Sequence, residues 1–114
     1  MEELKDMVEI SSDEDRLIAR LSGEIDHHAA RPIREEIDSA LYRMHPNELC
    51  LDFTLVRFMD SSGIALIIGR AELARDMGCR VAVRGLSRTQ EKLVKLSGVE
   101  RLPGVTVEKM EVKK

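Results

Sequence analysis

Residues 58–70 read FMDSSGIALIIGR, and this stretch decides how the rest of the chain is arranged. It places an acid, two hydroxyls and a glycine directly before a run of bulky apolar residues. The helical pattern continues to Met77, and its first half is apolar on almost every side. A helix of this kind is buried on more than one side. We therefore predict a central helix over residues 62–77 that ends at Gly78.

The polar residues before that helix have three possible roles. Asp60 or Ser61 could cap the helix, an interaction that contributes about 1 kcal/mol. A serine could instead be a nucleophile, but a hydrolase elbow has glycines on both sides of its serine and here only Gly63 is present. The third role is a hydroxyl that another protein modifies. The motif by itself leaves these roles open.

The segments on either side alternate between strand and helix patterns. Short apolar runs predict strands, and apolar spacings of three and four predict helices. Residues 11–15 are polar and turn-like, Ser22-Gly23 breaks the second strand, and a short loop precedes the motif. The predicted strands are residues 7–10, 17–21, 49–53, 80–84 and 105–107, with residues 110–112 either extending the last strand or fraying. The predicted helices are residues 29–44, residues 62–77, and a segment between a Ser87–Gln90 capping box and Gly98.

This order predicts an α/β fold: a mixed sheet of four or five strands, with an amino-terminal hairpin, packed against helices. Strand–helix–strand units favour parallel neighbours, and the hairpin adds an antiparallel edge. At 114 residues the chain is expected to be one domain, residues 1–114 with a core over about 7–107. The working surface of such a sheet lies at the carboxyl ends of its strands. The 58–70 motif is expected at that edge.

Composition excludes several classes of function. The 18 basic and 21 acidic residues give a net charge of −3 without a basic block, and there is no Trp. Nucleic-acid binding is therefore not expected. The longest apolar run, residues 64–68, is far shorter than the ~20 residues of a membrane span. The acidic amino terminus lacks the features of a signal peptide, so we expect a cytoplasmic protein with no membrane partner.

The remaining chemistry-bearing residues favour structural roles. Cys50 and Cys79 are predicted to be reduced and buried. His27 and His28 are adjacent and point in different directions, so a shared metal site is not expected. Arg70 and residues 72–75 are expected to form the solvated side of the central helix. The sequence thus predicts no catalytic residue, cofactor or metal.

Two motifs resemble a known family. Residues 60–63, DSSG, between Phe58-Met59 and an apolar helix, resemble the phosphorylation motif of STAS-domain anti-sigma factor antagonists. Residues 21–28, LSGEIDHH, resemble the second signature of that family. The separation of the motifs and the order of elements match over about residues 7–107. The family usually has a further carboxyl-terminal helix. Residues 108–114 could form no more than about two turns of such a helix.

The resemblance implies a STAS fold and a binding protein that is not an enzyme. It implies that the unphosphorylated form binds an anti-sigma factor, which is also a serine kinase, and releases the sigma factor. Phosphorylation of Ser61 would abolish binding, and a serine phosphatase of the PP2C type would restore it. The free protein would be a monomer. The implied partner-binding residues are Gly23, Glu24, Asp26, His27, Asp60, Ser61, Ser62 and Gly63.

Some alternatives stay open at this point. Sporulation is the expected pathway, with general stress as the other, and the sigma factor itself is not identified. A nucleotide-binding STAS regulatory module is a second candidate, because a helix amino terminus attracts anions. A STAS scaffold in a stress-signalling assembly is a third. For Asp26, helix capping and partner contact are both expected roles.

Overall fold

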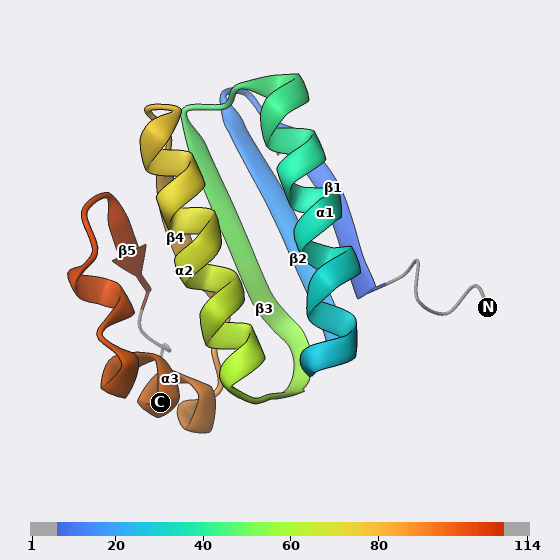
Figure 1. Cartoon of the computed structure of the whole chain (residues 1–114), viewed down its shortest axis with the longest axis vertical. Helices are drawn as coiled ribbons and strands as arrows, with labels where there is room; N and C mark the ends of the chain where they lie inside the picture. Colours follow the sequence, from blue (N-terminus) through green and yellow to red (C-terminus); the bar gives the residue numbers. More distant parts are fainter. Residues whose placement is uncertain (1–6, 109–114) are drawn as a thin grey trace, which may run out of the picture.

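The computed structural model describes residues 7–108, and the predictions for residues 109–114 lie outside this range. Strands and helices follow one another in the predicted order (Figure 1). A short 3-10 turn, Val99–Arg101, precedes the last strand. The strands are β1 (Val8–Asp13), β2 (Arg16–Ile25), β3 (Glu48–Met59), β4 (Arg80–Arg84) and β5 (Val105–Val107). The helices are α1 (His27–Met44), α2 (Ser61–Asp76) and α3 (Arg88–Ser97).

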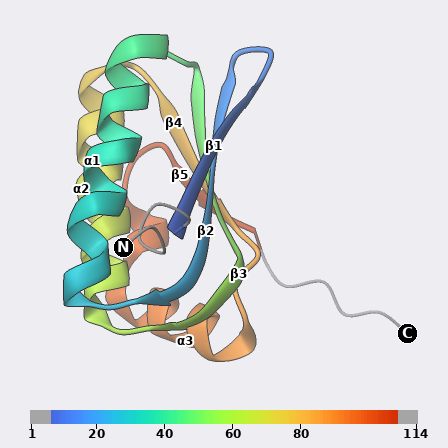
Figure 2. The same ribbon diagram turned by 90° about the vertical axis from the view of Figure 1, so that its right-hand side faces the viewer.

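The strands form one sheet in the order β1-β2-β3-β4-β5. β1 pairs antiparallel with β2, and the other neighbouring strands are parallel. α1 and α2 lie side by side against the same face of the sheet (Figures 1 and 2). This arrangement confirms the predicted α/β fold, its mixed sheet and its antiparallel amino-terminal edge.

The core lies between this sheet face and the helices. Parallel partners point to the same side of a sheet, so the paired residues Leu17 and Leu49 both face the helices. From α1, Ile33, Ile37 and Leu41 meet them, each with no more than 1% of its surface exposed. Burying one such side chain contributes roughly 1.5–3 kcal/mol. This packing fixes the position of α1 on the sheet.

The opposite face of the sheet is charged and largely self-paired. The strand register aligns two rows of alternating sign across four strands, Glu9–Arg20–Asp52–Arg84 and Asp13–Arg16–Glu48–Arg80. In the first row, Arg20 lies 3.6 Å from Glu9 and Arg84 lies 3.2 Å from Asp52. Because neighbouring charges compensate one another, this face needs no covering helix.

Two predicted strand ends were wrong. β2 does not stop before Ser22-Gly23 but continues to Ile25, with Gly23 in the left-handed region at φ +81°. β3 does not stop near Phe53 but continues to Met59, so the predicted loop before the motif is strand. Two register shifts between β2 and β3 explain both errors. Each shift gives β3 one residue more than β2, and such bulges disrupt a regular two-residue pattern.

The helix ends, the cysteines and the hairpin turn agree with the sequence in most respects. Gly78 and Gly98 follow α2 and α3 with positive φ, and Ser87 with Gln90 forms the predicted capping box. Cys50 and Cys79 are buried and free. The hairpin turn is confined to Glu14-Asp15, and α1 begins two residues before its predicted start. No helix within residues 7–108 has the length and apolarity to cross a membrane.

Candidate functional site

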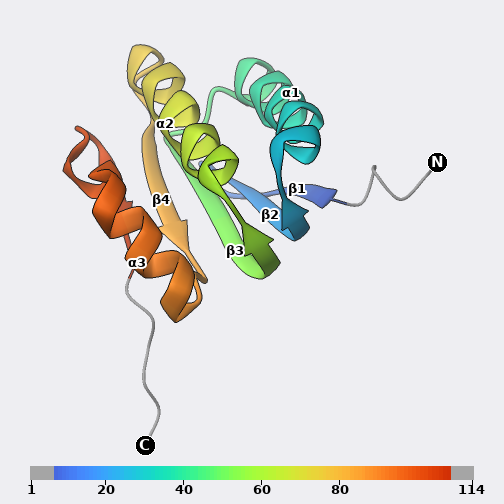
Figure 3. The same cartoon turned by 60° about the horizontal axis from the view of Figure 1, so that its bottom comes forward.

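The two motifs meet at one edge of the sheet. β2 and β3 are parallel neighbours, so they end together, with Ile25 opposite Met59. The backbone N–H of Asp60 donates a hydrogen bond to the carbonyl oxygen of Ile25, at 3.3 Å. Figure 3 shows both strands leading at this edge into the first turns of α1 and α2. The carboxyl-end location predicted for the motif is therefore confirmed.

An aspartate caps each of these helices. Asp26 accepts hydrogen bonds from the backbone N–H groups of His28 and Ala29, at 3.0 and 2.9 Å. Asp60 accepts one from the N–H of Ser62, at 2.7 Å. The N–H of Ala29 and, less strongly, that of His28 hold the pKa of Asp26 below its ordinary value. The capping roles predicted for Asp26 and Asp60 are confirmed.

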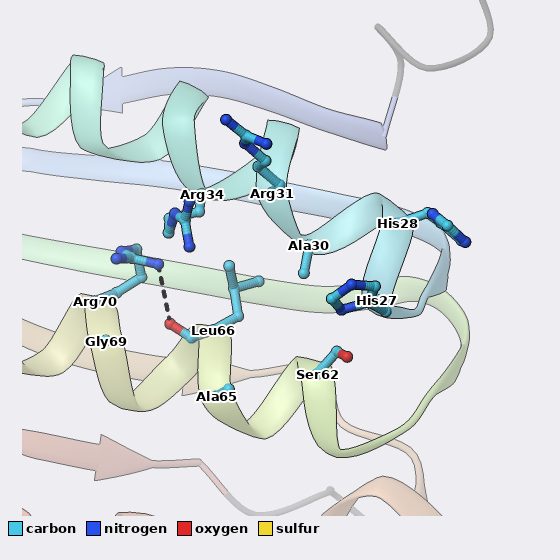
Figure 4. Close-up of a pocket in the computed structure, with 10 residues that line it drawn as sticks. All are labelled: His27, His28, Ala30, Arg31, Arg34, Ser62, Ala65, Leu66, Gly69 and Arg70. Carbon is cyan, nitrogen blue, oxygen red and sulfur yellow. Dashed lines mark hydrogen bonds between the residues drawn. The ribbon is translucent and has the colours of Figure 1, made fainter.

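The two serines differ in their surroundings. Ser61 is the first residue of α2 and is exposed. Its hydroxyl forms no hydrogen bond with any residue in the described part of the chain. Ser62 is half-buried and lies on the side of α2 that faces His27 (Figure 4). A partner protein can therefore reach the Ser61 hydroxyl more easily than that of Ser62.

Gly63 is required by its neighbour Met59. A Cβ atom at Gly63 would lie 2.6 Å from the sulfur of Met59 and 3.1 Å from its Cβ. The second atom is close to the backbone and has little freedom to move away. This close neighbour explains why a glycine occupies the first helical turn, and the contact joins the end of β3 to the start of α2.

The implied partner-binding residues come together at this edge. Gly23 and Glu24 belong to the last residues of β2, and Glu24 is exposed. Asp26 and His27 begin α1 next to the start of α2. We call the set the rim, which comprises Gly23, Glu24, Asp26, His27, Asp60, Ser61, Ser62 and Gly63.

Sequence reasoning missed an apolar pair beside the rim. Leu55 and Phe58 have 56% and 53% of their surface exposed, although both are in β3. Phe58 pairs with Glu24, so it belongs to the sheet face opposite the helices. Gln90 of α3 supports this irregular part of β3 by donating a hydrogen bond to the carbonyl of Val56, at 3.1 Å. The apolar residues after Phe53 were the signal that the strand continues.

A groove of about 560 Å³ begins at the rim and runs between α1 and α2 (Figure 4). We call it the α1–α2 groove. Its lining includes His27, Arg31, Arg34, Ser62, Leu66 and Arg70. The prediction that Arg70 is solvated was wrong, because only 6% of its surface is exposed. Arg70 lies 2.8 Å from Asp38 of α1, an ion pair between helices that single-helix periodicity cannot reveal.

Comparison with known proteins agrees with this architecture. The protein-family model described as "Mlab, STAS domain" matches residues 8–107. An anti-sigma F factor antagonist of Paenibacillus polymyxa is 36% identical over 86 residues, covering 75% of this chain and 74% of the relative. A protein of the same name from Lysinibacillus sphaericus is 32% identical over 83 residues, covering 73% and 71%.

Solved structures give the same result. The anti-sigma factor antagonist SpoIIAA in its unphosphorylated form has a TM-score of 0.70 and 26% identity, covering 91% of this chain and 89% of that one. The phosphorylated form of the Bacillus cell fate determinant SpoIIAA has a TM-score of 0.69 and 28% identity, covering 90% and 91%. With its fold, its two motifs and these relatives in agreement, the chain belongs to the STAS-domain anti-sigma factor antagonists.

Proposed function

We propose that the unmodified protein binds an anti-sigma factor through the rim and thereby frees a sigma factor. The anti-sigma factor is also a serine kinase in this proposal, and it phosphorylates Ser61. Phosphorylation ends the binding, and a serine phosphatase of the PP2C type restores it. The protein acts in the cytoplasm as a monomer when free, and it is a binding protein without catalytic activity of its own.

The observation that carries the proposal is the exposed Ser61 hydroxyl at the first position of α2. Phosphate adds about −1.5 to −2 charge and three acceptor oxygens. The N–H groups and dipole at a helix amino terminus favour a negative charge, so the modified serine is compatible with the fold. A partner covering the rim would have to desolvate that charge beside the carboxylates of Asp26 and Asp60. Phosphorylation is therefore expected to destabilise the complex and not the free protein.

The comparisons support a switch that needs no refolding. The chain is about equally similar to the unphosphorylated and phosphorylated forms of SpoIIAA, with TM-scores of 0.70 and 0.69. The same fold therefore matches both the unphosphorylated and the phosphorylated form of that protein. In the proposed switch, the phosphate changes charge and bulk at the surface without refolding.

Phosphate transfer tests the proposal. The full chain is incubated with ATP and the anti-sigma factor kinase of its own organism, followed by intact-mass measurement and peptide mapping. We expect one added phosphate on Ser61, none in Ser61→Ala, and normal modification in the matched control Ser62→Ala. No added phosphate, or a phosphate on Ser62, would contradict the proposal.

A further inference from the structure

We propose that the α1–α2 groove binds an acidic, partly apolar segment of the anti-sigma factor, as a second contact that adjoins the rim. This inference rests on the proposed function, because it assigns another contact to the same partner. It concerns a different surface from the Ser61 hydroxyl, and separate variants can test the two.

The groove has the dimensions and lining of a site for an extended chain segment. From Ser62 to Arg70 it follows two turns of α2, about 12 Å of helix. Leu66 and the small residue Ala65 contribute apolar surface, and Arg31, Arg34 and Arg70 contribute charge. A Cβ at Gly69 would meet no atom within 4 Å, so there is open space at that end. The lining combines apolar contacts with cationic donors.

Arg70 has donors that the protein itself does not use. Its guanidinium is buried, with 7% of the side chain exposed, and arginine carries five N–H donors. Nη1 donates one long hydrogen bond of 3.5 Å to the carbonyl of Leu66 (Figure 4). Nε lies 2.8 Å from the Oδ1 atom of Asp38 in an ion pair, and no residue among 7–108 accepts a hydrogen bond from Nη2. A mostly buried guanidinium with a donor to spare favours an additional acceptor supplied at the groove.

Arg34 makes the same surface more positive. It is exposed and forms no ion pair with any residue among 7–108, whereas Arg31 pairs with Glu35 and Arg70 with Asp38. Burial lowers the pKa of Arg70, and the charge of Asp38 acts to raise it. The nearby charge of Arg34 lowers it further, so the net shift of the pKa is downward. Two like charges side by side are unfavourable in the free protein. A carboxylate bound between Arg34 and Arg70 would relieve this repulsion.

The occupant we infer is a polypeptide rather than a nucleotide. No Phe or Tyr within residues 7–108 lines the groove, and the chain has no Trp, so a base would lack a stacking partner. The chain also lacks a glycine-rich phosphate loop ending in Lys-Ser or Lys-Thr. The groove begins at Ser62, next to Ser61, so a protein that covers the rim can place a segment in it. Glu or Asp side chains would meet the arginines, and apolar side chains would meet Leu66.

This contact would strengthen the effect of phosphorylation. A phosphate on Ser61 stands at the mouth of the groove, where an acidic segment has to enter. Its charge would act on that segment from the residue next to Ser62, and charges within the screening length of about 8 Å at physiological salt still repel. Phosphorylation would then weaken the partner's contacts with both the rim and the groove.

The test uses charge reversal at Arg34, with Arg43 as the matched control. Arg43 lies in the last turn of the same helix, is exposed, and has no ion pair with a described residue. Unmodified full-length protein and the variants Arg34→Glu and Arg43→Glu are titrated with the anti-sigma factor and with a fluorescein-labelled peptide of alternating Glu and Leu. Ala65→Leu, at an exposed helical position, fills the groove without changing charge.

We expect Arg34→Glu to weaken binding of both probes at least tenfold and Ala65→Leu to weaken it severalfold, with unchanged thermal unfolding. Arg43→Glu should bind like the unmodified chain. Equal affinity of Arg34→Glu and the unmodified chain for the anti-sigma factor would overturn the inference while leaving the proposed function intact. Binding of ATP in the groove, without binding of the acidic peptide, would also overturn it. If the acidic peptide binds but the anti-sigma factor does not, the groove is a site for acidic segments, but its assignment to that partner and the proposed function are both wrong.

Discussion

The hydrogen bond from the N–H of Asp60 to the carbonyl of Ile25 joins the ends of the two central strands, at 3.3 Å. Each strand is followed at once by a capping aspartate and a helix. The LSGEIDHH motif (residues 21–28) and the DSSG motif (residues 60–63), which are far apart in the sequence, are thereby held side by side. Under the proposed function, a phosphate on Ser61 would therefore lie at the same edge as the residues of the second motif.

Asp26 can be tested for two roles with one pair of variants. Asp26→Ala removes the acceptor of two backbone N–H groups and should lower the melting temperature, whereas Asp26→Asn keeps a capping oxygen and should retain most of the stability. If the charge also contacts the partner, Asp26→Asn should weaken binding to the anti-sigma factor. Circular dichroism melting and calorimetric titration check the two effects. Normal melting of Asp26→Ala would contradict the capping role.

The glycines of α2 provide a second pair. Gly63→Ala should destabilise the protein by about 1–3 kcal/mol, because the new Cβ would overlap Met59. Gly69→Ala, in the same helix, has free space around its Cβ and should stabilise by roughly 0.5–1 kcal/mol. Urea unfolding measures both changes. Equal changes in the free energy of unfolding of the two variants would show that helix propensity, and not the Met59 contact, determines the effect of the substitution.

Local sequence patterns predicted the helix ends but not the features that depend on contacts between distant elements. Gly78, Gly98 and the Ser87–Gln90 box were predictable because caps depend on residues only a few positions apart. The bulges that carry β3 past Phe53 depend on the partner strand, so the local pattern did not predict them. The burial of Arg70 depends on Asp38 of another helix in the same way.

In the candidate site, too, the sequence predicted the residues of each motif but not the features that depend on distant elements. Its residues came from two motifs and a family resemblance, and the parallel pairing of β2 with β3 brings them together. The sequence did not predict that Ser61 is more exposed than Ser62, because this difference depends on where α2 begins. Leu55 and Phe58 were missed because their exposure depends on how the bulges turn them outward.

Phe58 should contribute to partner binding and little to folding. Phe58 is 53% exposed and lies next to Glu24 of the rim, and exposed aromatic residues often anchor interfaces. Phe58→Ser should therefore weaken binding to the anti-sigma factor at least tenfold, with a small change in melting temperature. Tyr42→Ser, a similarly exposed aromatic near the other end of α1, is the control and should bind normally. Equal affinities of the two variants would contradict this role.

Asp52 should make stability depend on pH at the acid end. Its burial acts to raise its pKa, but hydrogen bonds from the Thr54 hydroxyl and N–H, together with Arg84, outweigh burial and lower the pKa below its ordinary value. The carboxylate therefore stabilises the fold above about pH 4, and this contribution is lost as the pH falls through the lowered pKa. Asp52→Asn should cost about 1–3 kcal/mol at neutral pH and progressively less in acid. A cost independent of pH would contradict this sign.

The affinity of the anti-sigma factor for unmodified and Ser61-phosphorylated protein tests the central claim most directly. Calorimetric titration of both forms, with melting curves to compare their folds, makes the measurement. We predict superimposable folds and at least a hundredfold weaker binding after phosphorylation, equivalent to about 3 kcal/mol. Equal affinities for the two forms would contradict the account.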